Sequence, residues 1–144
     1  MNEKYPTVHV DPVIITKDYR VVLALRREDI EEGGKWHLPG GQVLYGDTIL
    51  DALKRHTLRK TGLKIDFYYP FEKKSLVSTH TNPKRDRRGH FIALVFLCKL
   101  VGGDLKPGEN IQDVKFFSKQ ELKNLDIGWD HREMIEDAFK KLSF

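Results

Sequence analysis

The sequence has one cysteine, no long apolar run and no low-complexity tract, and each absence narrows the class of protein. A single cysteine, Cys98, excludes an internal disulfide and fits a reducing compartment. The N-terminal residues MNEKYPTVHV lack the apolar region of a signal peptide, and no apolar run reaches the length of a membrane span. We therefore expect a cytoplasmic protein with no membrane partner, in which Cys98 packs in the core.

The length of the chain predicts a single small domain, and its charge is mildly basic. The 144 residues suffice for a single domain, residues 1–144, to bury a core without disulfides. The formal net charge of +4 and the isoelectric point near 9.1 permit an anionic ligand but do not require nucleic acid.

Strand and helix patterns follow one another along the chain. Two β-branched runs separated by Lys17-Asp18 predict a hairpin, and the apolar run from His90 to Leu100 is typical of a central buried strand. Gly102-Gly103 predicts a turn, and Ser118 with Glu121 forms a capping box for a short helix. The predicted strands are 8–16, 21–25, 65–69, 75–79, 90–100 and 114–117, and the predicted long helices are 48–61 and 132–142.

The stretch GGQVLYGDTILDALKRHTLRKTGL, residues 40–63, combines a glycine pair, a capped helix and a closing glycine. Asp47 is suited to cap the helix, and Gly62 can adopt the left-handed conformation that ends it. A core-facing stripe recurs at helical spacing, formed by Ile49, Ala52, Leu53 and Thr57.

The spacing of this stretch resembles the Nudix box, the signature of hydrolases that cleave a nucleoside diphosphate linked to another moiety. The family pattern is Gly, five residues, Glu, seven residues, then Arg-Glu-apolar-x-Glu-Glu-x-Gly-apolar. The positions that match in register are Gly41, Arg55, Gly62 and Leu63. Asp47 stands at the place of the first Glu, whereas the other three are replaced by His56, Arg59 and Lys60. The resemblance implies the Nudix fold, which is an α/β fold with a mixed sheet sandwiched between helices.

The three replacements change the chemistry that the resemblance implies. Positions 56, 59 and 60 share one face of a helix, where carboxylates would hold Mg²⁺ against the substrate phosphates and help to activate a water. The implied cofactor is therefore Mg²⁺ if the chain is active, and none otherwise. Arg59 and Lys60 can instead bind phosphate directly. They can also be solvated cations that interact with the helix dipole, with His56 as a packing residue.

The carboxylates left near the box are Asp47, Asp51, Glu109 and Asp113, and they are the remaining metal candidates. Glu109 and Asp113 lie in GENIQD, a region from which family members often draw a metal ligand or the group that activates water. They are therefore the candidate general bases, although turn-forming polar residues before a strand would look the same.

Substrate contacts are expected from two further segments. Trp36 precedes Leu-Pro-Gly-Gly, as an aromatic residue does in the family, and can either stack on a base or fill the core. The segment RDRRGHFIALVFL resembles ADP-ribose pyrophosphatase-like members, and so do GGDLKPGENIQDVKFFSKQEL and Asp130-His131. In the first segment Arg85, Arg88 and His90 can cradle phosphate or ribose, or form a solvated basic loop.

Three functions remain open. The first is a Nudix hydrolase of an ADP-ribose-like compound or nucleotide sugar, with activity impaired by the loss of the box carboxylates. The second is a catalytically inactive module that binds the same nucleotides. The remote third is an RNA-contacting module, which rests on net charge and loop 84–88 and lacks interleaved aromatics. The expected partner is a small-molecule nucleotide and not nucleic acid, and the resemblance adds a homodimer as an alternative to a monomer.

Overall fold

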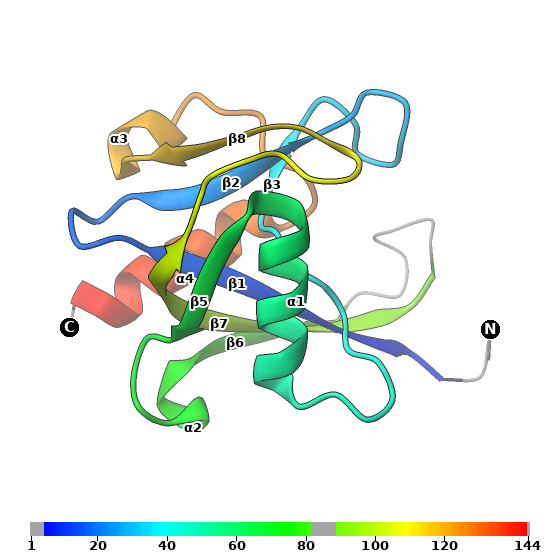
Figure 1. Cartoon of the computed structure of the whole chain (residues 1–144), viewed down its shortest axis with the longest axis vertical. Helices are drawn as coiled ribbons and strands as arrows, with labels where there is room; N and C mark the ends of the chain where they lie inside the picture. The colour runs from blue at the N-terminus through cyan, green and yellow to red at the C-terminus, as the bar shows by residue number, and fades with distance from the viewer. Residues whose placement is uncertain (1–4, 82–88, 144) are drawn as a thin grey trace.

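The computed structural model describes residues 5–81 and 89–143. Helices α1 (Ile49–Thr61) and α4 (His131–Ser143) lie on opposite faces of one mixed β-sheet (Figure 1). The expected α/β fold, a mixed sheet sandwiched between helices, is confirmed. The two other helices are short, α2 (Glu72–Ser75) and α3 (Lys119–Leu122).

The predicted strands and long helices are all present, with ends that differ by a few residues. The strands are β1 (Thr7–Ile15), β2 (Val21–Arg26), β3 (Trp36–His37), β4 (Gly41–Gln42), β5 (Leu63–Phe67), β6 (Leu76–Thr81), β7 (Phe91–Gly103) and β8 (Ile111–Phe117). The sequence did not predict β3, β4 or α2, because elements of two to four residues carry no periodicity.

Strand β7 is central, as its apolar sequence predicts. It pairs in parallel with the whole of β1 and antiparallel with β5 and β6 on its other edge. The predicted hairpin of β1 and β2 is confirmed, and β2 also pairs with β3 and β8. The turn predicted at Gly102-Gly103 is wrong, because both glycines pair with the start of β5 and extend β7.

The core has two main layers, one on each side of the sheet. Ala52 and Leu53 of α1 pack against one face, together with Val10, Ile14, Val22, Ile65 and Phe96. Met134, Ile135 and Ala138 of α4 pack against the other, together with Val13, Ile15, Leu23, Val95 and Leu97. Cys98 is fully buried in the first layer, where burial raises the pKa of its thiol, so it is a core residue as expected.

The cap of α1 differs from the prediction by one residue. Thr48, and not Asp47, is the N-cap, because its hydroxyl accepts from the Asp51 amide at 3.0 Å while the Asp51 carboxylate accepts from the Thr48 amide at 3.1 Å. Gly62 ends the helix in the left-handed conformation, with φ of 77° and its N–H donated to the Leu58 carbonyl.

Candidate functional site

The face of α1 that carries the three replacements is bonded to the glycine segment. The Lys60 ammonium donates to the Gly40 carbonyl at 2.6 Å, and His56 Nε2 donates to the Gln42 carbonyl at 2.8 Å. Arg59 donates to His56 Nδ1 at 3.0 Å. The replacements therefore pin the helix to residues 40–42 through side-chain contacts.

His56 is a neutral residue within this arrangement. A carbonyl only accepts hydrogen bonds, so the contact with Gln42 places the ring proton on Nε2 and leaves Nδ1 as the acceptor for Arg59. Burial lowers the pKa of His56, and Lys60 and Arg59 lower it further. The ring also occupies the space beside Gly41, where an added Cβ would lie 2.4 Å from a ring carbon. Glycine at position 41 and histidine at position 56 are thus matched by shape.

The box acids Asp47 and Asp51 are both engaged in holding the local structure. Asp47 accepts from Arg55 at 2.8 Å through one oxygen and from the Leu44 amide at 2.8 Å through the other. The hydrogen bond from Arg55 lowers the pKa of Asp47, and the same contact raises the pKa of Arg55. Asp51 belongs to the capping box. Both carboxylates act as structural partners here.

The residues of the box do not fit a divalent metal. Mg²⁺ requires several oxygen ligands, whereas positions 56, 59 and 60 present a neutral imidazole and two cations. The Gly40 carbonyl, an oxygen next to this face, is already bonded to the Lys60 ammonium. A dication at this position would meet the repulsion of Arg59 and Lys60 without compensating carboxylates. The cation beside the Gly40 carbonyl is the Lys60 ammonium.

Lys60 lines a cavity beside the glycine segment, called the box cavity below. Its volume is about 50 Å³. It is enclosed by β1, the glycine segment, α1 and the start of α4. Its lining residues are His9, Asp11, Arg26, His37, Leu38, Gly40, Gly41, Lys60, Phe91, Trp129, Asp130, His131 and Met134.

His37 contributes a buried acceptor to the box cavity. Its Nδ1 lies 2.7 Å from the Ala24 carbonyl and must donate to it, which leaves Nε2 unprotonated. Within residues 5–81 and 89–143, this Nε2 has no hydrogen-bond partner, and the side chain is 2% exposed. Burial strongly lowers the pKa of His37, so the ring stays neutral at physiological pH. A buried, unpartnered acceptor of this kind favours a ligand or water that donates to it.

A second cavity adjoins the first and contains one of the predicted bases. It has a volume of about 210 Å³ and shares Arg26 and Lys60 with the box cavity. Glu109 lines it, together with Ile30, Arg59, Asn110 and Ile111. Asp113 lines neither cavity, since it lies on β8, where one oxygen accepts from the Val114 amide. The structure thus separates the two candidate bases and brings only Glu109 beside Lys60.

The predicted substrate residues are placed away from the box cavity or outside the described chain. Trp36 packs edge-on against Phe117, with ring centres 4.8 Å apart, and lies against the core. Of the two roles expected for Trp36, stacking on a base or filling the core, it has the second. His90 is exposed, and its Nε2 lies 3.1 Å from the Thr81 hydroxyl. Arg85 and Arg88 lie outside the described residues.

The structure gives contacts to Trp129 and Arg26, which the sequence did not single out, and to His131, which it named only as part of a resemblance. Trp129 lines the box cavity, and the Arg26 guanidinium lies 4.8 Å from the centre of its ring. His131 accepts from the Leu38 amide at 2.9 Å, which fixes the start of α4 against the glycine segment. The signal that could have indicated them is the Trp-Asp-His sequence at the start of the last helix.

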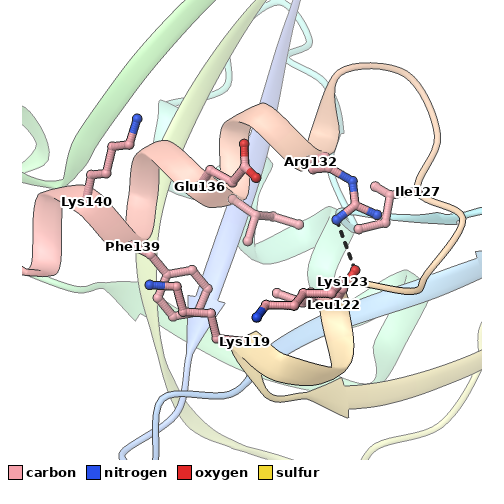
Figure 2. A pocket seen from close by; sticks show the side chains of 9 residues that line it. Lys119, Leu122, Lys123, Ile127, Arg132, Glu136, Phe139 and Lys140 are labelled. Carbon is pink, nitrogen blue, oxygen red and sulfur yellow. Dashed lines mark hydrogen bonds between the residues drawn. The ribbon is translucent and has the colours of Figure 1, made fainter.

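A larger cavity of about 560 Å³ lies between α3 and α4 (Figure 2). None of the predicted site residues in the described ranges lines it. Arg132 at its edge donates to the carbonyls of Leu122 and Leu125 at 2.9 and 2.6 Å, so this side chain fastens the segment after α3.

Comparison with known proteins assigns the family. The model of the NUDIX domain matches residues 6–138. The chain belongs to the NUDIX family. An ADP-ribose pyrophosphatase of Methanocaldococcus jannaschii is 37% identical over 138 residues, which cover 94% of this chain and 75% of that protein. This NUDIX chain is also 27% identical to the ADPR responsive transcriptional repressor NtrR of Acinetobacter baylyi, over 96% of this chain and 55% of the repressor.

Solved structures show the same fold. The NUDIX domain of Shewanella oneidensis NrtR, complexed with ADP ribose, superposes with a TM-score of 0.77 at 22% identity. The match covers 99% of this chain and 94% of that chain. Hydrolases of the NUDIX family generally use divalent metals, and NUDIX homologues bind small nucleotides such as ADP-ribose. Among the residues that the structure describes, no helix has the length and apolar character needed to cross a membrane.

Proposed function

We propose that this NUDIX chain binds and hydrolyses an ADP-ribose-like compound, a nucleoside diphosphate joined to a second moiety. The observation that carries the proposal is the position of Lys60 and Arg26, which line both the box cavity and the cavity of Glu109. Two cations at a shared wall are suited to a diphosphate, because ammonium and guanidinium groups bind phosphate oxygens directly. The 37% identity to an ADP-ribose pyrophosphatase supports the same ligand class.

The box cavity adds one contact for a small group of the ligand. Its volume is about 50 Å³, and His37 Nε2 offers a hydroxyl or amino group there a buried acceptor. In the reaction, water adds across the P–O–P bridge, which yields AMP and ribose 5-phosphate from ADP-ribose. Glu109 is the proposed acceptor of the proton from that water, because it is the carboxylate that lines the cavity of about 210 Å³ together with Lys60, Arg26 and Arg59.

The test compares two carboxylates of the same acidic stretch. AMP release from ADP-ribose is measured with Mg²⁺, with Mn²⁺ and in EDTA. Glu109→Gln is expected to lower kcat by about 100-fold or more, the usual effect of removing a general base, while Asp113→Asn leaves it unchanged. Absence of turnover under every condition, or equal losses in the two variants, would contradict the proposal.

A second candidate function is favoured by the contact between Lys60 and Gly40. A fixed ammonium binds the diphosphate equally before and during reaction, and such uniform binding gives affinity without catalysis. The chain would then be a NUDIX-fold nucleotide-binding module. Thermal stabilisation by ADP-ribose in EDTA, with no AMP released under any condition, is the result that selects this function over hydrolysis.

A further inference from the structure

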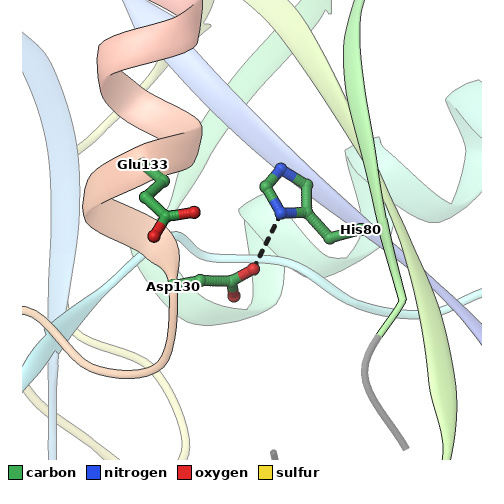
Figure 3. Close-up of side chains that lie close together, drawn as sticks. All are labelled: His80, Asp130 and Glu133. Atoms are coloured by element: carbon green, nitrogen blue, oxygen red, sulfur yellow. Dashed lines mark ion pairs between the residues drawn. The ribbon is translucent and has the colours of Figure 1, made fainter.

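We infer that His80, Asp130 and Glu133 form a binding site for a divalent transition metal such as Zn²⁺. His80 comes from β6, Asp130 directly precedes α4, and Glu133 lies in its first turn. Figure 3 shows both carboxylates directed toward the imidazole. One candidate ligand atom from each residue lies within 4.8 Å of the other two, and His80 Nδ1 is 2.8 Å from Asp130 Oδ2.

The spacing of these atoms suits a single ion. Ligands at about 2.1 Å from one metal stand about 3 to 4 Å apart, so an ion would move His80 Nδ1 and Asp130 Oδ2 slightly apart from their 2.8 Å contact and draw in Glu133. Glu133 is exposed and free to make that rotation, whereas the Asp130 side chain is only 9% exposed. One imidazole and two carboxylates are a three-residue ligand set that leaves coordination positions open for water or substrate.

The histidine is also held as metal-binding histidines are held. Ser78 and His80 are two residues apart on β6, so their side chains share a face, and the Ser78 hydroxyl lies 3.0 Å from His80 Nε2. In the metal-free chain Nδ1–H donates to Asp130 at 2.8 Å, so the Ser78 hydroxyl donates to Nε2. A metal that binds Nδ1 would take the place of this proton, and Nε2–H would then donate to the Ser78 oxygen. A partner on the second ring nitrogen fixes the tautomer and the orientation of a ligating imidazole.

The site adjoins the box cavity through Asp130, which lines it. The same cavity contains His37 Nε2, a buried acceptor without a partner in the described chain. A donor bound in this cavity would satisfy that nitrogen, and water held by a metal is a strong hydrogen-bond donor. The unpartnered nitrogen points to an occupant of the box cavity, which the proposed metal site meets only at Asp130.

The imidazole decides the class of metal. Histidine nitrogen suits zinc, cobalt and nickel, whereas Mg²⁺ prefers oxygen ligands and keeps most of its water. We therefore expect this site to bind Zn²⁺ or Co²⁺ and to ignore millimolar Mg²⁺. It is a different site from the metal face of the Nudix box, and its occupancy does not depend on nucleotide hydrolysis.

Metal titration without nucleotide tests the inference. The full chain is freed of metal with EDTA and titrated with Co²⁺ by visible absorption and with Zn²⁺ by calorimetry, in the presence of Mg²⁺. One equivalent is expected to bind, and Glu133→Gln, Asp130→Asn and His80→Asn each weaken binding at least tenfold. Because Glu133 is exposed, its variant tests the site without risk to the fold. Glu136→Gln, an exposed acid of the same helix, is the control and is expected to bind within twofold of the unaltered chain.

Two results would overturn the inference. One is absence of binding in the unaltered chain, and the other is binding that Glu133→Gln and Glu136→Gln leave equally intact. Covalent labelling of Ser78 by a fluorophosphonate would also overturn it, because Ser78, His80 and Asp130 would then act as a nucleophilic relay. Since no nucleotide enters the titration, failure here leaves the proposed hydrolysis standing, and failure of hydrolysis leaves the metal site standing.

Discussion

Two walls of the box cavity carry side chains of opposite charge. On one wall, α1 presents the Lys60 ammonium, which is bonded to the Gly40 carbonyl. On the other, the start of α4 presents Asp130, with His80 and Glu133 close by. The Nudix box would place carboxylates on the first wall, where this chain has cations. Within this NUDIX chain, one cavity therefore has a cation on one wall and a carboxylate on the other.

The opposite characters have different consequences for a ligand. A diphosphate is attracted directly by Lys60 and Arg26, so it needs no bridging dication on the α1 wall. The proposed metal ligands lie beside the α4 wall, and Asp130 is the one of the three that lines the cavity. A transition metal bound by them would therefore stand next to the cavity that Lys60 also lines.

Restoring acids on the α1 wall is expected to have the largest effect. The double variant Arg59→Glu, Lys60→Glu removes the two cations and places carboxylates where the box pattern has them. ADP-ribose affinity measured by calorimetry in EDTA should fall by about 100-fold or more, since each charged hydrogen bond contributes about 1.5 to 3 kcal/mol. Added Mg²⁺ should recover part of the loss. The control is Lys54→Glu, Lys64→Glu, which makes the same change of four charges at two exposed lysines, and an equal loss in that variant would show that only net charge matters.

A smaller effect, on stability, is expected from a substitution of Gly41, because the His56 ring fills the space beside it. Gly41→Ala places a methyl group 2.4 to 2.7 Å from three ring atoms of His56, so the ring must leave its bond with Gln42. We expect a loss of about 1 to 3 kcal/mol in the free energy of unfolding, measured with urea. In a His56→Ala background the same glycine substitution should cost less than about 1 kcal/mol. Equal costs in the two backgrounds would show that the ring does not require glycine here.

The stability of the fold is expected to depend on pH through His37 and His56. Burial lowers the pKa values of His37 and His56 below the ordinary 6.5, so the unfolded chain binds more protons than the folded chain just below that pH. The contribution of the two neutral rings to the free energy of unfolding is therefore complete above about pH 6.5. It falls as the pH drops toward 5, by up to about 1.4 kcal/mol per pH unit for each histidine. Urea unfolding at several pH values measures the slope, and His56→Gln should reduce it. Stability that stays constant or rises over this range would contradict the assignment of neutral rings.

Local sequence determined most of the fold but only part of the site. The hairpin, central strand β7 and the two long helices follow from periodicity within each segment, so they were predictable. The cap of α1 was predicted one residue early, because Asp47 and Thr48 are both good caps and the choice depends on Arg55, which pairs with Asp47. The turn at Gly102-Gly103 failed because pairing with β5 outweighs the local preference of glycine.

The remaining site residues depend on contacts between distant segments. Trp36 and Trp129 look alike in the sequence, yet one packs against the core and the other lines the box cavity. His80 meets Asp130 only because β6 and α4 pack together, which no local pattern indicates. The three box replacements were visible from the sequence, but their bonds to residues 40–42 required the structure.

The role of Lys60 is tested by the affinity of the unaltered chain for ADP-ribose, measured by calorimetry in EDTA and again with Mg²⁺. If the Lys60 ammonium takes the place of a metal on the α1 wall, the two dissociation constants should agree within about twofold. Binding that appears only with Mg²⁺ would contradict this role of Lys60, because the diphosphate would then require a dication beside Arg59 and Lys60.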